Sequence, residues 1–280
     1  MTTVAPTLIA EACAALGVSD VNPIGAPGGQ KAVRHVRRGT DDLVMKVIAI
    51  RSSSPTTLTR AEREVELLKS LGSQHVVRVE SDLVRLGNPV HGAVWLEEFL
   101  DGDDLTGHLG PQWSWAETAK LGLEVANGLA VAHAAGVIHR DLSSNNVRRL
   151  SDGTYKVMDF GFARHTLRTG LTVAGQPGTP GFLSPEHLNA YSGVPMPASD
   201  VFGVGTLMYV ALTGELPIPY TGDDTDYVSR LRKVAIIDIA VKRPDLTTDE
   251  QALVRRTLHP QPARRFLNGR KLADAMELLQ

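Results

Sequence analysis

Residues 136–161 read GVIHRDLSSNNVRRLSDGTYKVMDFG, and no other stretch constrains the fold of this chain as strongly. Two acidic tripeptides, His139-Arg140-Asp141 and Asp159-Phe160-Gly161, place their aspartates 18 residues apart, and Asn146 lies five residues after the first aspartate. Between them, Ser151-Asp152-Gly153 is a turn signal flanked by two short strand-like stretches, which predicts a β-hairpin. Such a hairpin folds the chain back, so both carboxylates can face one cleft.

The bulk composition is that of an ordinary soluble globular protein. The 280 residues are 42% hydrophobic and 21% charged, which is enough for one large domain or two lobes. A net charge of -2 gives no reason to expect nucleic acid or a membrane surface as partner. Cys13 is the single cysteine, so no internal disulfide is possible and we expect a reducing, cytoplasmic location. No run approaches the roughly 20 apolar residues that span a bilayer.

Hydrophobic periodicity divides the chain into a β-rich first part and a helical remainder. In the first part we expect a short helix within the extension 1–20, strands within 21–50, an amphipathic helix over 57–71, and strands over 75–80 and 93–99. In the remainder we expect helices over 115–136, 199–214, 226–237, 248–258 and 269–279. The pattern predicts an α+β arrangement with an N-lobe over about 21–99, a C-lobe over about 100–280, and a connector near 98–104.

The order of motifs resembles the eukaryotic-type (Hanks-type) serine/threonine protein kinase domain, as a divergent bacterial member. A Gly-rich segment, a strand Lys, a helix Glu, the HRD tripeptide with its Asn, DFG, and the APE-like GTPGFLSPE (178–186) follow in the family order. Each motif alone is weak evidence, and their joint occurrence is strong. The resemblance implies one domain over 1–280 with the bilobal protein kinase fold: a small β-rich N-lobe with one main helix and a larger helical C-lobe.

The resemblance also implies the cofactors ATP and Mg²⁺ and a set of catalytic residues. Asp141 would accept the proton of the substrate hydroxyl. Asn146 and Asp159 would bind Mg²⁺, a hard ion that prefers oxygen ligands. Lys46, a charged residue inside the apolar strand LVMKVIAI, would hold the α- and β-phosphates and pair with Glu64 of the following helix.

The remaining nucleotide contacts are assigned by position in the same family pattern. They are Gly25, Gly28 and Gly29 of IGAPGGQKAV, Val33 above the adenine, the backbone near Glu98 and Leu100, and Arg148 beneath the adenine, its stem against the base and its charged head turned to solvent. A Walker A loop is excluded, because Gln30-Lys31-Ala32 stands where that loop needs GK[ST].

Besides Arg148 and besides Ser184, which replaces the Ala of the APE motif, three positions depart from the family pattern. Ser143 replaces a Lys that stabilises the transferring phosphate, a loss worth about 3 kcal/mol, or roughly a hundredfold in rate. Lys31 replaces the third glycine of the Gly-rich loop. Glu97 stands at the gatekeeper position, where a buried carboxylate needs a partner that the sequence does not identify.

Several further contacts follow from the resemblance. Glu186 would pair with Arg265, Thr179 would contact Asp141, and Asp200 would anchor the HRD backbone. Arg140 would receive a phosphate from the activation segment 162–183, and the regulatory candidates there are Thr166, Thr169 and Thr172. The resemblance also implies a regulatory role for Thr179.

Three functions fit these motifs. The first is a serine/threonine protein kinase acting on a protein substrate or on itself, the second a nucleotide-binding pseudokinase that serves as a scaffold or switch, and the third a small-molecule phosphotransferase. GTPGFLSPE and Arg265 argue against the third, because they belong to the protein-substrate platform of the family. Retention of Lys46, Glu64, Asp141, Asn146 and Asp159 favours the first over the second.

Overall fold

The computed structural model describes residues 4–24, 31–50, 56–110, 112–160, 179, 181–188 and 196–279. These residues form two compact units. The first unit holds the described residues up to Gly72 together with Val77–Leu100, and the second holds Ser73–Val76 and the described residues from Asp101 onward. The step from Leu100 to Asp101 falls inside the predicted connector. The α+β expectation, a β-rich first part and a helical remainder, is confirmed.

The first unit is built on a five-stranded antiparallel sheet with the order β1-β2-β3-β5-β4. The strands are β1 (Ser19–Pro23), β2 (Lys31–Arg38), β3 (Asp41–Ala49), β4 (Val84–Leu86) and β5 (Gly92–Glu98). The register places Lys46 of β3 opposite Val33 of β2 and opposite Trp95 of β5. Directly opposed residues share a face of the sheet, so these three side chains lie on one face.

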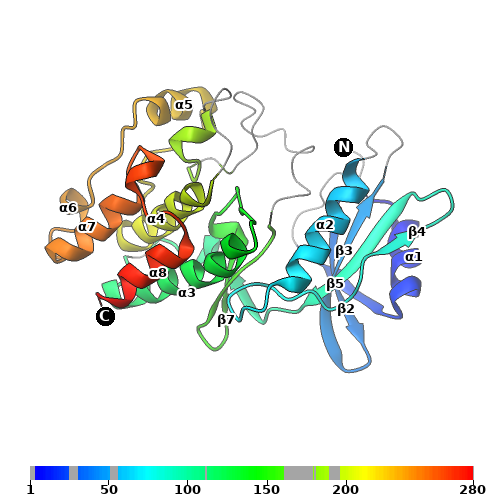
Figure 1. Cartoon of the computed structure of the whole chain (residues 1–280). Coiled ribbons are helices and arrows are strands. Elements are labelled where there is room, and N and C mark those ends of the chain that lie inside the picture. Colours follow the sequence, from blue (N-terminus) through cyan, green and yellow to red (C-terminus); the bar gives the residue numbers. More distant parts are fainter. Residues whose placement is uncertain are drawn as a thin grey trace. The chain divides into compact units, whose positions relative to one another are not determined.

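The other face of this sheet is apolar and is covered by α1 (Pro6–Leu16), which Figure 1 shows beside β4 and β5. Met45 and Val47, which alternate with Lys46 along β3, are fully buried in this cluster together with Leu8 and Ala12 of the helix. The helix ends at Gly17, whose φ of 63° is the left-handed conformation favoured at a helix C-terminus. The predicted N-terminal helix is confirmed, and its role in the described structure is to close the core.

Helix α2 (Thr56–Ser70) runs across the sheet in Figure 1 and confirms the predicted helix over 57–71. The predicted strand over 75–80 is wrong. Only two isolated bridges occur there, between Val76 and Val157 and between Val79 and Glu97. Val157 lies in β8 (Tyr155–Val157) of the second unit, whereas Glu97 lies in β5 of the first. Because the two bridges join different strands, the segment cannot extend as one strand of one sheet.

The second unit is mainly helical and contains one small sheet with the order β6-β7-β8. Its central helices are α3 (Trp115–Ala134) and α4 (Pro197–Thr213); α4 is almost wholly buried, as its apolar sequence predicts, and α3 packs against α4 and α8. The other elements are β6 (Gly102–Asp104), η1 (Leu105–Gly107), η2 (Ser144–Asn146), β7 (Val147–Leu150), β8 (Tyr155–Val157), η4 (Pro185–Leu188), α5 (Asp224–Arg232), α6 (Ile239–Lys242), α7 (Thr248–Thr257), η5 (Pro262–Arg264) and α8 (Gly269–Glu277).

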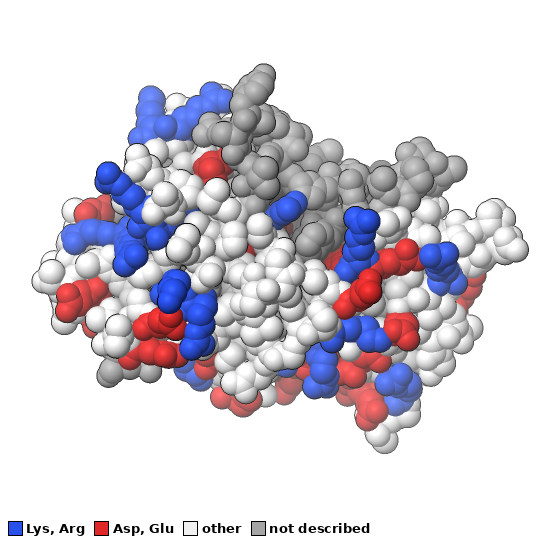
Figure 2. All heavy atoms as spheres, in the orientation of Figure 1, with Lys and Arg blue, Asp and Glu red and all other residues white. Residues whose placement is uncertain are grey.

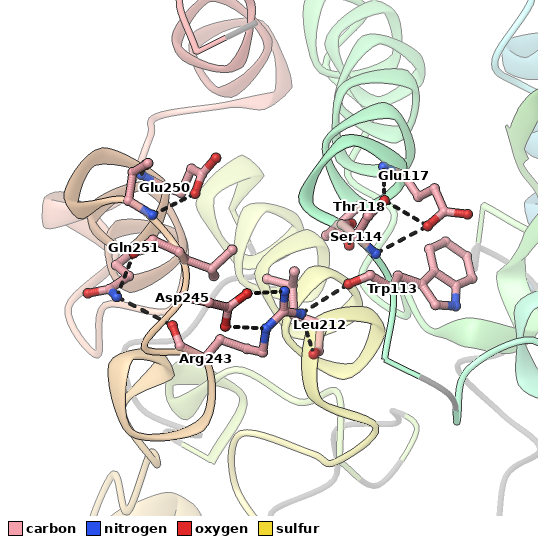
Figure 3. A network of polar contacts seen from close by, with 11 residues as sticks. Trp113, Ser114, Glu117, Thr118, Leu212, Arg243, Asp245, Glu250 and Gln251 are labelled. Carbon is pink, nitrogen blue, oxygen red and sulfur yellow. Dashed lines mark hydrogen bonds and ion pairs between the residues drawn. The ribbon is translucent and has the colours of Figure 1, made fainter.

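A polar network around Arg243 joins three separate segments of the second unit (Figure 3). The Arg243 guanidinium donates to the carbonyl of Trp113 at 3.0 Å and to that of Leu212, in the last turn of α4, at 2.9 Å. Asp245 binds the same guanidinium through two hydrogen bonds of 2.8 Å. Because carbonyls in the last turn of a helix have no partner within the helix, Arg243 satisfies one of them at the end of α4.

The charged surface is mixed. On the face shown in Figure 2, Lys and Arg side chains alternate with Asp and Glu side chains, in keeping with the net charge of -2. No helix among the described residues combines the length and the apolar character needed to cross a lipid bilayer.

Candidate active site

The backbone of the HRD tripeptide is held by a buried carboxylate at the start of α4. Asp200 accepts hydrogen bonds from the His139 amide at 2.7 Å and from the Arg140 amide at 2.9 Å. Nε2 of His133, on α3, lies 2.9 Å from the same carboxylate. Burial raises the pKa of Asp200, but the hydrogen bond from His133 and the other contacts outweigh burial, so the pKa lies below its ordinary value. The predicted anchoring of the HRD backbone by Asp200 is confirmed.

Both motif tripeptides contain a residue with a left-handed backbone. Arg140 has a φ of 69° and Asp159 a φ of 52°. Within the described ranges, Val234 is the single other non-glycine residue with a positive φ. This conformation is unfavourable for a residue with a side chain and persists where surrounding contacts enforce it, commonly at functional sites. For Arg140, the hydrogen bond from its backbone amide to the Asp200 carboxylate is such a contact.

His139 joins the two tripeptides, a role that the sequence analysis did not assign. Its buried ring lies with Nε2 2.8 Å from the Met158 carbonyl, and Nδ1 accepts the Asp141 amide at 3.3 Å. The ring centroid is 4.9 Å from that of Phe160. Through these contacts of its two ring nitrogens, His139 ties the first motif to the second.

The Asp141 carboxylate is oriented by Thr179. Oδ1 of Asp141 accepts the Thr179 amide at 3.0 Å and the Thr179 hydroxyl at 2.9 Å, which confirms the predicted contact. The same hydroxyl lies 3.4 Å from Oγ of Ser143. Ser143 is completely buried, so the position where the family usually has a Lys carries a hydroxyl packed against Thr179.

The β7–β8 hairpin brings Asn146 beside the second motif, as the spacing predicts. The Met158 amide donates to the Asn146 carbonyl at 2.8 Å, so the residue that precedes Asp159 is bonded to Asn146. Nδ2 of Asn146 donates to the Asp141 carbonyl at 2.6 Å and lies 3.4 Å from the Asp141 carboxylate. The nitrogen side of the amide is thereby turned toward Asp141. An amide oxygen and the Asp159 carboxylate are the ligand types that fit a hard divalent cation.

In the first unit, Lys46 forms an ion pair with Glu97. Nζ of Lys46 lies 2.7 Å from Oε2 of Glu97, and the indole nitrogen of Trp95 donates to Oε1 at 3.0 Å. Among the described residues, the gatekeeper carboxylate therefore has one side-chain partner on β3, Lys46, and one on β5, Trp95. Glu64 lies on α2 and is buried, and its pairing with Lys46 stays a prediction.

The predicted nucleotide contacts have different outcomes. Gly25, Gly28 and Gly29 lie outside the described residues. Val33 lies on the Lys46 face of the sheet, as its assigned role requires. The Glu98 amide donates to the Arg78 carbonyl at 2.9 Å, so that amide is already used within the first unit. Leu100 is buried at the end of the first unit.

The prediction for the charged head of Arg148 is wrong. The guanidinium is not turned to solvent but donates to the carbonyl of Gly102, on the neighbouring strand β6. Its Nε atom is buried and has no hydrogen-bond partner within the described part of the chain. The strands approach closely here, since a Cβ on Gly102 would lie 2.1 Å from the Arg149 carbonyl oxygen. A backbone acceptor is therefore within reach of the Arg148 side chain, and an isolated strand sequence does not reveal it.

The predicted pair between Glu186 and Arg265 is confirmed. Nη1 and Nη2 of Arg265 bind the two carboxylate oxygens at 2.6 and 2.8 Å, in a bidentate arrangement with the arginine side chain fully buried. Burial raises the pKa of Glu186, but the bonds from Arg265 outweigh burial and hold that pKa below its ordinary value. Thr166, Thr169 and Thr172 lie outside the described residues.

Comparison with known proteins agrees with these motifs. The sequence matches the protein kinase domain family over residues 20–277. It is 30% identical to the serine/threonine-protein kinase drp72 of Corynebacterium efficiens over 265 residues, 90% of this chain and 49% of that protein. Identity to Mycobacterium tuberculosis PknL is 33% over 208 residues (71% and 49% of the two chains) and to PknK 29% over 271 residues (94% and 24%), both serine/threonine-protein kinases. The chain thus spans about half the length, or less, of these curated relatives, and it belongs to the protein kinase domain family.

Proposed function

We propose that this chain is a serine/threonine protein kinase that transfers the γ-phosphate of ATP to a Ser or Thr hydroxyl of a protein, its own chain included. The observation that carries the proposal is the fixation of Asp141. Its carboxylate accepts two hydrogen bonds from Thr179, while Asp200 holds the backbone just before it through two amides. A general base must be held in one orientation to accept a proton from a hydroxyl, and this arrangement supplies that orientation.

In the proposed reaction, Asp141 accepts the proton of the substrate hydroxyl while the hydroxyl oxygen forms a bond to the γ-phosphorus. The bond between that phosphorus and the β,γ-bridging oxygen breaks, and ADP leaves with the bonding electrons. Lys46 binds the α- and β-phosphates. Glycines 25, 28 and 29, Val33, Arg148 and the backbone at Glu98 and Leu100 contact the remainder of the nucleotide.

Asn146 and Asp159 would hold the magnesium ion, since both offer oxygen ligands to a hard cation. When bound, magnesium spreads the negative charge of the phosphates. The chain's own contribution is orientation: the amide nitrogen of Asn146 is bonded to Asp141, so its oxygen is the atom that remains to serve as ligand. The single cysteine, Cys13, supports a cytoplasmic location.

Autophosphorylation with labelled Mg-ATP tests this function. Asp141→Asn should lower the rate by about 10²–10⁴-fold while the fold stays intact, because the general base is lost. Lys46→Met should raise the KM for ATP. Asp249→Asn is the matched control, since this exposed carboxylate lies on α7. Equal labelling of the wild type and Asp141→Asn would reject the assignment of Asp141.

A pseudokinase remains the second candidate, and one observation favours it. Ser143 is buried against Thr179 and brings no cation to the position of the missing Lys. Absence of labelling in the wild type, together with a melting temperature raised by Mg-ATP, would support nucleotide binding without transfer. Labelling that depends on Asp141 would exclude it.

We also propose that phosphorylation of Thr169 or Thr172 regulates the activity, with Thr166 as a further acceptor. Arg140 supports this proposal, because it adjoins Asp141 and its guanidinium could bind a phosphate. Mass spectrometry after incubation with Mg-ATP should find phosphate in the segment 162–183. An active preparation without phosphate there would reject the proposal.

A further inference from the structure

The first unit buries two opposite charges on one face of its sheet. The ammonium of Lys46 and the carboxylate of Glu97 lie 2.7 Å apart, and the residues are 4% and 2% exposed. The second carboxylate oxygen accepts the indole N–H of Trp95 at 3.0 Å. Trp95 is itself fully buried, so Glu97 is held by a side chain that has little freedom to move.

The backbone makes this pair rigid. Strands β3 and β5 are paired over Leu43–Ala49 and Gly92–Glu98, with Lys46 directly opposite Trp95. Glu97 follows Trp95 by two residues, which places it on the same face of the sheet as Lys46. All three side chains therefore project from two strands whose relative position is fixed by the hydrogen-bond ladder.

Electrostatics makes the two residues dependent on each other. A buried charge is costly unless an opposite charge and hydrogen bonds compensate it. Glu64 of α2 is a second buried carboxylate in this unit, at 2% exposure. Glu97 takes one of the three N–H donors of the Lys46 ammonium.

We propose that Glu97 is a positioning residue for Lys46, and that Trp95 positions Glu97 in turn. The inference rests on the proposed function, in which Lys46 binds the nucleotide phosphates. Through Glu97, the ammonium is anchored to the same sheet that carries it, by a partner on the adjacent strand. Nucleotide affinity should then depend on Glu97 even though its own carboxylate is directed at Lys46 and Trp95.

A double-mutant cycle tests the pair without reference to nucleotide. Glu97→Leu and Lys46→Met should each lower the urea midpoint of unfolding, because each removes one member of a buried ion pair and leaves the other member in place. The double variant should lose less than the sum of the two, since it replaces the pair by two apolar side chains. Additive effects would overturn the proposed dependence of each residue on the other.

Nucleotide binding tests the positioning role, with isothermal titration of Mg-ATP and steady-state kinetics as readouts. Glu97→Leu should raise the dissociation constant by about tenfold or more, with KM for ATP rising more than kcat falls. Glu97→Gln keeps hydrogen-bonding atoms and should restore part of the affinity. Trp95→Phe removes only the indole donor and should weaken binding by about two- to threefold. Glu66→Gln, an exposed residue of α2, is the control.

The outcomes separate the two proposals. If the wild type binds Mg-ATP and Glu97→Leu binds it with the same constant, the positioning role is overturned while the proposed function stands. If the wild type binds no Mg-ATP, the proposed function fails and this inference fails with it. A stability cycle that shows coupling together with unchanged nucleotide affinity would make the pair purely structural, which also overturns the proposal.

Discussion

The two units fix their important charged groups in different ways. In the first unit, Lys46 and Glu97 pair through their side chains, on strands that are already bonded to each other. In the second unit, the Asp200 side chain binds the backbone amides of His139 and Arg140, which lie in a loop. A sheet fixes its own main chain, so its side chains have only to balance charge. A loop has no ladder, so a buried side chain must hold the main chain itself.

Removal of the loop anchor should therefore have the largest effect on stability. Asp200→Leu leaves the amides of His139 and Arg140 buried without an acceptor, and we expect the free energy of unfolding to fall by about 3–5 kcal/mol. Urea denaturation followed by circular dichroism measures the change. Asp226→Asn, which removes an exposed carboxylate paired with Arg230, is the control. An unfolding midpoint unchanged in Asp200→Leu would show that the loop is held by other contacts.

Acid should lower the stability of the second unit by protonating buried carboxylates such as that of Asp200. The pKa values of Asp200 and Glu186 are lowered from 3.8 and 4.5 by their bonds to His133 and Arg265, against the opposing effect of burial. The stability that these two carboxylates contribute is complete at a pH above their unfolded-state pKa values. It is lost as the pH falls through their lower folded-state pKa values. The urea midpoint should fall with pH in this acid range, and less steeply in Glu186→Gln. Equal slopes for both proteins would contradict the prediction.

Arg243 offers the comparison with opposite sign, because its cation binds backbone carbonyls as the Asp200 anion binds backbone amides. Arg243→Lys keeps the charge but loses the planar fork that reaches Trp113, Leu212 and Asp245 together. We expect a loss of about 1–3 kcal/mol in the free energy of unfolding. Arg230→Lys, in an exposed pair on α5, should change stability far less. Equal losses in the two variants would show that the fork geometry of Arg243 contributes nothing.

Much of the fold could be predicted from the sequence, because the signals are local. The helices follow from hydrophobic periodicity with stop signals such as Gly17, and the hairpin around Ser151-Asp152-Gly153 follows from its turn residues. The contacts of Asp200 and Thr179 and the Glu186–Arg265 pair could be predicted because family position fixes which residues meet.

The remaining features depend on which distant segments meet, and sequence does not encode this locally. The partner of Glu97 follows from the β3–β5 register, and His133 reaches Asp200 through the packing of α3 on α4. The segment around Val76 and Val79 has a strand-like sequence, yet it divides its bridges between two strands. Arg148 meets Gly102 only because two strands approach closely. In each case the outcome depends on a contact with a residue that is distant in the sequence.

The smallest effect is expected where solvent can replace the lost partner, at the first turn of α3. Ser114 accepts the Glu117 amide at 3.3 Å, and the Glu117 side chain accepts the Ser114 amide at 3.1 Å, which is a capping box (Figure 3). Ser114→Ala should cost about 1 kcal/mol in the free energy of unfolding. Water can reach the amides exposed at this helix end, whereas it cannot reach those at Asp200.

Ser114→Thr, which keeps a hydroxyl at the N-cap, is the matched control and should stay close to the wild type. Urea denaturation of Ser114→Ala, Ser114→Thr and Asp200→Leu side by side measures both anchoring modes on one scale. A loss in Ser114→Ala as large as that in Asp200→Leu would contradict the argument. It would mean that the exposure of the freed amides to water does not lower the cost of losing their partner.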